Sequence, residues 1–135
     1  MTGLKIQGLE EFQQKLKTIE KKAPDRILNK LDSEGNALIR AVRANTPQGP
    51  TGNLKKGYRL TQVEKIQGGY QKGLYTRAPH FHLVEKGHRK VTPSGKEIGW
   101  TPGVFMLERT MNEREEQTVE SLRHWLDELF EELSR

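Results

Sequence analysis

The sequence predicts an α+β fold in which a small antiparallel sheet packs against two N-terminal helices and one long C-terminal helix. Apolar residues recur at helical spacing near both ends of the 135-residue chain. Between them lie short segments in which polar and apolar residues alternate, as in strands, separated by glycine and proline. At this length we expect one domain, residues 1–135.

The two N-terminal helices are predicted from apolar stripes on either side of Pro24. A short alternating segment before them, Leu4–Ile6, is a candidate first strand. The stripe of the first helix comprises Leu9, Phe12, Leu16 and Ile19. The second helix is expected to run from Pro24 to Asn45, with a stripe of Ile27, Leu28, Leu31, Leu38, Ile39 and Val42. Gly35 interrupts this stripe, so we expect either the close approach of another backbone there or a mild kink.

Strand segments are predicted in the middle of the chain. Tyr58–Ile66 and Tyr70–Thr76 alternate in polarity, and Gly68-Gly69 is predicted to form the hairpin turn between them. Phe81–Val84 is expected to be a third strand or the end of one. Two polar stretches that contain glycine, proline and lysine are expected to be projecting loops: Thr46–Gly57 and His88–Lys96.

The C-terminal helix is predicted to begin at Pro102 and to have two apolar ends. Its first stripe is Val104, Leu107 or Glu108, and Met111, and the polar segment Asn112–Thr118 follows. The stripe then resumes, and we expect a core or an assembly interface at Leu122, Trp125, Leu126 and Leu129. Two packing surfaces would explain this pattern, the first on the chain's own sheet and the second on its N-terminal helices or a neighbouring copy. One long helix over a single core, with a solvated middle, would explain it equally.

Charge is distributed unevenly along the chain, whose net charge is +5. Residues 40–96 contain twelve Lys and Arg against two acids, a balance of +10. Residues 101–135 contain four Arg against nine acids, a balance of −5. The basic region is expected to meet nucleic-acid phosphates or the acidic end of a neighbouring copy, unless it is only a solvated surface. The candidate contact residues are Lys55, Lys56, Lys86, His88, Arg89, Lys90 and Lys96.

No catalytic site is expected. The chain has no cysteine, and its serines lie in no nucleophile context. His80, His82 and His88 lie near Glu85, and the first two would share one face of a strand, as paired metal ligands must. They match no recognised ligand spacing, so we expect no cofactor, and a metal-dependent hydrolase is the least favoured interpretation. No apolar run is long enough to span a bilayer, so no membrane partner is expected.

Three short motifs occur along the chain in this order: Thr51-Gly52-Asn53-Leu54, Val84-Glu85-Lys86-Gly87 and Pro102-Gly103-Val104-Phe105. The order resembles that of the HK-97-type phage tail-component family, the gene-product-10-like neck and tail-completion proteins. The chain departs from the family pattern at Lys86, where a small or aromatic residue is usual, and before Pro102, where the usual Pro-Ala-rich approach is missing.

The resemblance implies a non-enzymatic structural protein of a phage or prophage particle that acts where heads join tails. Such a protein would assemble into a ring around the DNA channel. Its partners would be other copies of itself, head-closure and tail-terminator or tail-tube proteins, and packaged DNA without sequence specificity. It would be located in the neck or tail of the virion, and in the host cytoplasm before assembly. The alternative from another class is a non-specific nucleic-acid-binding protein.

Overall fold

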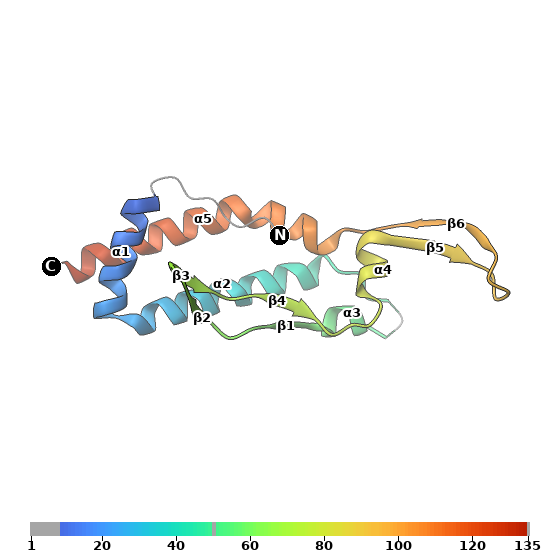
Figure 1. Ribbon diagram of the computed structural model, residues 1–135, viewed down its shortest axis with the longest axis horizontal. Coiled ribbons are helices and arrows are strands. Elements are labelled where there is room, and N and C mark those ends of the chain that lie inside the picture. Colours follow the sequence, from blue (N-terminus) through green and yellow to red (C-terminus); the bar gives the residue numbers. More distant parts are fainter. Residues whose placement is uncertain (1–8, 50, 135) are drawn as a thin grey trace.

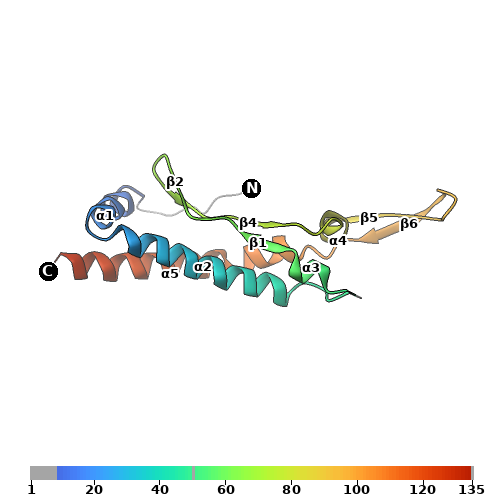
Figure 2. The ribbon, with the colours of Figure 1, turned by 90° about the horizontal axis from the view of Figure 1, so that it is seen from below.

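The computed structural model describes residues 9–49 and 51–134 and has an elongated body with one projecting arm (Figure 1). The body has two layers, a pair of long antiparallel helices and a strand hairpin that lies along them (Figure 2). This confirms the predicted α+β class and the long C-terminal helix. The strands of the described residues form three separate two-stranded sheets rather than one. The candidate strand Leu4–Ile6 lies outside the described residues.

Two helices precede the strands, as predicted. They are α1, Leu9–Lys22, and α2, Pro24–Ala44, with Pro24 in the first turn of α2, where its missing N–H is not needed. α2 runs along the body, and α1 crosses the end that lies far from the arm (Figure 1). The expectation that another backbone approaches Gly35 closely was wrong, because the side chain of Lys72 lies beside this glycine. A Cβ at Gly35 would lie 2.8 Å from Lys72 Cε.

The long helix α5, Met106–Leu133, begins later than expected, because Pro102 ends a strand and Phe105 is the N-cap residue. With 28 residues the helix is about 42 Å long at 1.5 Å per residue. The predicted first stripe was also wrong in register, since the first buried residues are Met106 and Thr110, whereas Met111 is 38% exposed. No helix in the described part of the chain is long and apolar enough to cross a membrane.

The central strands form one long antiparallel hairpin with an irregular middle. They are β1, Tyr58–Leu60; β2, Glu64–Ile66; β3, Gly69–Gln71; and β4, Leu74–Thr76. β1 pairs with β4 and β2 with β3, so the predicted continuous strand from 58 to 66 is interrupted. Residues 61–63 face only residues 72–73, and the extra residue bends the hairpin. Ile66 pairs with Gly69, so the turn is Gln67-Gly68, with Gly68 at φ 84°, one residue before the expected pair.

Two predicted segments differ in type from the structure. The run Phe81–Val84 is helical, in α4, Phe81–Lys86, because a short apolar run fits a helix turn as well as a strand. The predicted basic loop His88–Lys96 lies mostly in a third hairpin, formed by β5, Gly87–Val91, and β6, Glu97–Pro102. The other predicted loop, Thr46–Gly57, contains a short helix, α3, Asn53–Lys56.

The core consists of two hydrophobic clusters at opposite ends of the α2–α5 pair. The distal cluster joins α1, α2 and the C-terminal half of α5 through buried Ile19, Ile27, Leu126 and Leu129. The proximal cluster joins the end of α2 to β1 through buried Ile39, Val42 and Tyr58, with Phe81 and Leu107 packed against it. This confirms the interpretation with two packing surfaces, and both surfaces are found within the chain.

Polar side chains fill the interface between α2 and α5 that separates the two clusters. The Ser121 hydroxyl accepts a hydrogen bond from Lys30 Nζ at 3.0 Å and donates one to Glu34 Oε1 at 2.8 Å. Nearer the proximal cluster, Asn45 Nδ2 donates to Thr110 Oγ1 at 2.9 Å. A partly buried polar group is satisfied only when its partner stands opposite, so these contacts fix the position of α5 along α2.

Charged pairs tie the strand hairpin to the helices. Lys65 Nζ and Tyr70 Oη donate to the Glu20 carboxylate on α1 at 2.9 Å and 2.7 Å. These hydrogen bonds lower the pKa of the Glu20 carboxyl below its ordinary value, and the one from Lys65 has the larger effect. Lys72 crosses Gly35 and reaches Asp32 Oδ1 at 3.0 Å. Such exposed pairs stabilise little individually, but they set the orientation of the hairpin over the helices.

We expect Leu126→Ala to lower the free energy of unfolding by about 2–5 kcal/mol, because truncation leaves a cavity in the distal cluster. Leu126 is only 2% exposed. Urea unfolding followed by circular dichroism measures the change. Leu122→Ala on the same helix is the matched control, since Leu122 is half-buried, and it should lose less. Equal losses for the two variants would contradict the placement of the distal cluster.

Candidate assembly interface

The β5–β6 hairpin, which we call the arm, projects from the end of the body where α3 and α4 lie (Figures 1 and 2). Its strands are antiparallel, with Arg89 opposite Trp100 and Lys90 opposite Gly99. Val91 then pairs with Glu97, so Ile98 is an extra residue that forms a bulge. Every residue from 89 to 100 is exposed except residue 92, which is half-buried. The arm therefore presents most of its surface to solvent.

A buried carboxylate at the base of the arm caps α5. Glu85, 6% exposed, accepts hydrogen bonds from the backbone N–H groups of Leu107 and Glu108, each at 3.0 Å and each with a different carboxylate oxygen. These N–H groups lie in the first turn of α5, where the helix itself offers no acceptor. A carboxylate at this point also faces the positive end of the helix dipole. Glu85 thus supplies the cap that the side chain of the N-cap residue, Phe105, cannot supply.

Two glycines allow the chain to cross itself at the base of the arm. A Cβ at Gly103 would lie 2.5 Å from the Lys86 carbonyl carbon and 2.8 Å from the Gly87 nitrogen. A Cβ at Gly87, whose φ is 91°, would lie 2.5 Å from the Thr101 oxygen. The closest obstructing atoms at both positions are backbone atoms, so the movement of a side chain would not make room. Glycine at both positions is what lets β6 leave the arm directly against the end of α4.

The base of the arm is connected to the proximal cluster through α4. Phe81 packs edge-on against the ring of Tyr58, with ring centroids 6.0 Å apart. Tyr58 is fully buried, and its hydroxyl lies 2.9 Å from Thr46 Oγ1, which in turn donates to the Val42 carbonyl at 2.6 Å. Burial raises the pKa of Tyr58 above its ordinary value. The base of the arm is therefore joined to the proximal cluster by buried and partly buried side chains.

The arm carries apolar side chains that its own chain leaves uncovered. Trp100 is 57% exposed, Ile98 61% and Val91 60%. Trp100 pairs across the hairpin with Arg89, and Arg89 and Val91 lie on the same face because side chains alternate along a strand. One face of the arm thus combines an exposed aromatic ring, an exposed β-branched residue and a guanidinium group.

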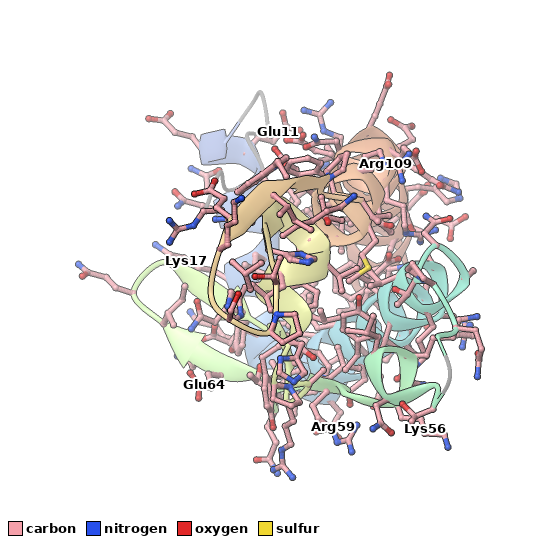
Figure 3. All side chains as sticks on the ribbon, turned by 90° about the vertical axis from the view of Figure 1, so that its right-hand side faces the viewer. Glu11, Lys17, Lys56, Arg59, Glu64 and Arg109 are labelled. Atoms are coloured by element: carbon pink, nitrogen blue, oxygen red, sulfur yellow. The ribbon has the colours of Figure 1, made fainter. Side chains whose placement is uncertain are left out.

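The seven predicted contact residues gather at the arm end of the molecule, but on more than one element. Lys86 ends α4, and Lys55 and Lys56 lie on α3 beside the base of the arm. Figure 3, which views the molecule from the arm end, shows Lys56 at the lower rim of the body. The residues of the arm itself are His88, Arg89, Lys90 and Lys96.

The environments of the arm residues differ. Arg89 lies 3.9 Å from Glu97, but both side chains are mostly exposed, so the pair is weak and the cation stays available. Lys90 and Lys96 are exposed. His88 is half-buried, with Nδ1 3.5 Å from the Leu83 oxygen, so it faces α4 rather than a partner. Arg89, Lys90 and Lys96 are therefore the members of the predicted set that the arm offers to another molecule.

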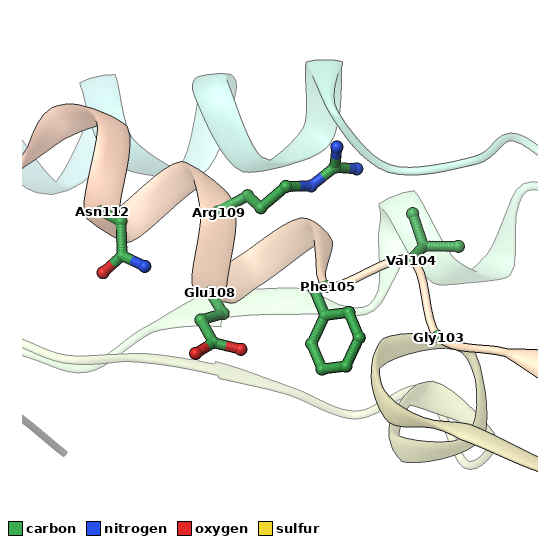
Figure 4. A pocket seen from close by; sticks show the side chains of 6 residues that line it. All are labelled: Gly103, Val104, Phe105, Glu108, Arg109 and Asn112. Atoms are coloured by element: carbon green, nitrogen blue, oxygen red, sulfur yellow. The ribbon is translucent and has the colours of Figure 1, made fainter.

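An open hollow of about 620 Å³ lies at the start of α5 and is lined in part by Phe105, Glu108, Arg109 and Asn112 (Figure 4). Phe105, Glu108 and Asn112 point to the same side of the helix in this view. Phe105 is 40% exposed and has left-handed backbone angles, φ 52° and ψ 40°, which are uncommon for an aromatic residue. Hydrogen bonds from the Val104 and Phe105 N–H groups to the Val84 and Glu85 carbonyls hold this conformation. Such held strain is common where proteins bind partners.

The histidines do not form the expected paired arrangement. His80 is the N-cap residue of α4 and His82 lies within that helix, so the predicted shared strand face was wrong. Glu85, the expected carboxylate partner, is occupied as the cap of α5. Within the described residues, no group of three or more His, Asp or Glu side chains could hold a metal ion.

Three of the four residues in the second predicted set lie in the distal cluster of the chain itself. Leu126 and Leu129 are buried there, and Trp125 packs against them. Leu122 is half-buried. Of the two roles predicted for this set, core and assembly interface, the buried members fill the core.

Sequence reasoning missed the residues that build the base of the arm: Glu85 as a cap, Gly87 and Gly103 at the crossing, and Phe105 at the hollow. A cap from another element leaves no local pattern, because Glu85 precedes the N–H groups it serves by more than twenty residues. The one available signal was that the motifs 84–87 and 102–105 each contain a glycine.

The chain is similar to a known protein family. The model of the family described as "Bacteriophage HK97-gp10, putative tail-component" matches residues 10–87. This is more than half of the chain, from α1 to the first residue of the arm. No curated protein matches the chain, and no solved structure does.

We expect Glu85→Ala to lower the free energy of unfolding by about 1–3 kcal/mol, because the Leu107 and Glu108 N–H groups lose their acceptor. Urea unfolding measures the loss, and Glu85→Gln, which keeps one acceptor oxygen, should lose less. The control is Glu113→Ala, which removes an exposed carboxylate from the same helix and should change stability by about 0.5 kcal/mol or less. A Glu85→Ala protein as stable as this control would show that the cap does not stabilise α5.

We also expect Gly103→Ala to destabilise the protein by about 1–3 kcal/mol, because its Cβ would overlap backbone atoms of α4 and β5. Gly69→Ala is the matched control, since nothing lies within 4 Å of its Cβ position. Thermal unfolding of the two variants distinguishes the sites. Equal melting temperatures would mean that the chain does not cross tightly at the base of the arm.

Proposed function

Because the chain belongs to the HK97-gp10-like family of bacteriophage tail components, we propose that it is a non-enzymatic structural protein of the head–tail junction. In this role it assembles with other copies of itself into a ring around the DNA channel. The ring contacts head-closure proteins on one side and tail-terminator or tail-tube proteins on the other. The protein resides in the neck or tail of the virion, and in the host cytoplasm before assembly.

The observation that carries this proposal is the arm. A two-stranded hairpin is marginally stable in water when nothing packs on it. Here the hairpin extends beyond the body and exposes Val91, Ile98 and Trp100. An exposed aromatic residue among charged neighbours is the composition of a protein–protein contact. An arm of this kind is useful to a protein whose task is to join subunits.

The assignment of a structural rather than catalytic role is supported by how the polar groups are used. Glu85 is the one buried carboxylate among the described residues, and both of its oxygens accept backbone hydrogen bonds. Thr46 and Thr110, the other buried polar residues there, are hydrogen-bonded within the helices and to neighbouring side chains. These groups hold the fold together.

Non-specific contact with DNA is a second candidate role, which the basic balance of residues 40–96 favours. Lys55, Lys56 and the arm cations lie at one end of the molecule, so a ring could present them together to a phosphate backbone. In the proposed ring this contact is compatible with the structural role, because the channel carries DNA through the same subunits.

The proposal is tested by interrupting the coding sequence with an early stop codon in a phage or prophage that carries it. We expect DNA-filled heads and separate tails in electron micrographs, and no infectious particles. Supplying the intact chain from a plasmid should restore joining. Normal particles without the protein would refute a role in the virion. Heads without any tails in the lysate would assign the protein to tail formation instead of the junction.

A further inference from the structure

We propose that the arm of one copy binds the exposed acidic segment of α5 on a second copy, at the carboxylates Glu113, Glu115, Glu116 and Glu120. This inference deepens the proposed function and rests on the ring of identical subunits that it includes. It assigns the contact that would hold neighbouring subunits together.

The first step is that the arm has a face without a partner. Trp100, Ile98 and Val91 are each more than half exposed, whereas the base below them is tightly packed through Glu85 and Gly103. The body therefore holds the arm in position, and its apolar side chains remain in water. Burying them against another protein surface is favourable, since apolar area leaves water.

The second step is the charge of the two surfaces. The arm, residues 87–102, contains three Lys and Arg against one acid, a balance of +2. Residues 112–121 on α5 contain four Glu against one Arg, a balance of −3. The Arg114 Nε atom is buried and has no hydrogen-bond partner among the described residues, so this side chain turns inward from the acidic surface. The arm and the acidic segment of α5 thus carry net charges of opposite sign.

The third step is that these four carboxylates are available. All four glutamates are exposed, and none forms an ion pair within the described part of the chain. By contrast, Asp127 and Glu128 further along α5 pair with Lys15 and His124. The four carboxylates of the acidic segment therefore remain available to a partner, with exposed Arg109 one turn before Glu113.

The fourth step is geometric. α5 starts at the base of the arm and runs away from it, whereas the arm extends in the opposite direction (Figures 1 and 2). An arm held in this way points away from the acidic segment of its own chain. The complementary surfaces can therefore meet only between copies. Two arms are poor partners for each other, because each carries the same positive balance.

Apolar groups are available beside the acidic segment. Met111 is 38% exposed, and Phe105 at the hollow is 40% exposed. Trp100 or Ile98 of an arriving arm would find these side chains next to the carboxylates. A contact with apolar groups at its centre and charges around them has the usual organisation of a protein interface.

The contact joins different surfaces on the two copies, so each copy keeps one free arm and one free acidic surface. Such head-to-tail contacts propagate, and they close into a ring when the rotation between copies permits. The arrangement also predicts sensitivity to salt, because exposed charges are screened over about 10 Å at 0.1 M ionic strength.

Charge exchange between two variants tests the proposal. Arg89→Glu/Lys90→Glu makes the arm acidic, and Glu115→Lys/Glu116→Lys makes α5 basic, so each variant alone repels itself. In an equimolar mixture the acidic arm of the first variant can bind the basic α5 of the second. The basic arm of the second variant can bind the acidic α5 of the first, so both contacts between alternating copies are attractive again. The matched control is Lys17→Glu/Lys21→Glu, which makes the same charge change as the arm variant on exposed residues of α1. Self-association of the full-length chain is measured by sedimentation at about 50 mM and 500 mM salt.

We expect each exchanged variant to associate at least about tenfold more weakly than the unaltered chain at low salt. The control should associate as strongly as the unaltered chain. The mixture should recover association, and high salt should weaken the unaltered chain. The proposal is overturned if the mixture gains nothing over its components, if the exchanges have no effect, or if the unaltered chain does not self-associate. It is equally overturned if the arm exchange abolishes binding to duplex DNA but leaves self-association intact.

The stop-codon phage separates this proposal from the proposed function. If the intact chain restores joining of heads and tails and both exchanged variants restore it equally well, the junction role stands and the arm contact is wrong. If the intact chain restores nothing, the junction role itself is wrong, whatever the sedimentation shows.

Discussion

The hydrogen bonds from the start of α5 to the Glu85 carboxylate are the interaction on which the rest of the structure depends. A helix of 28 residues begins with N–H groups that need acceptors, and Phe105 at the cap position has none to offer. Glu85 supplies them from α4, so the direction of α5 is fixed by a separate element. The same contact sets the base of the arm, because Lys86 and Gly87 follow directly. The segments 84–87 and 102–105, distant in sequence, are in this way one structural unit.

Along the α2–α5 pair, apolar contacts at the two ends alternate with polar contacts between them. Two hydrophobic clusters stabilise the ends of the pair, and the Lys30–Ser121–Glu34 contacts lie between them. Apolar packing alone would tolerate sliding of one helix along the other by a turn, since one apolar contact can replace another. Hydrogen bonds between specific side chains do not tolerate it. Thr110 and Ser121, two polar residues of α5 that face α2, thus contribute positional accuracy.

The sequence predicted those parts of the fold that depend on local periodicity. The stripes of α1 and α2 and the second half of α5 were identified from spacing, because residues such as Phe12, Leu126 and Leu129 face the core at helical intervals. It failed where a long-range contact decides the structure. Phe81–Val84 is helical, and Phe81 packs on Tyr58. The basic stretch after it pairs with residues 97–102, although its lysines, glycine and proline favour a loop. The sequence around Glu85 indicates its neighbouring histidines but not its role as a cap, because the N–H groups that it accepts from lie more than twenty residues ahead.

The charge of the arm serves two requirements that would otherwise conflict. A free hairpin with exposed Val91, Ile98 and Trp100 has open strand edges, and such edges pair readily with one another. Lysine and arginine on the arm oppose pairing between arms, because the positive charges would be brought together. The same charges favour a partner that carries carboxylates, as the acidic segment of α5 does. A surface can stay unpaired in the free protein and still bind during assembly when its partner carries the opposite charge. The division of this chain into a basic arm and an acidic helix provides that condition.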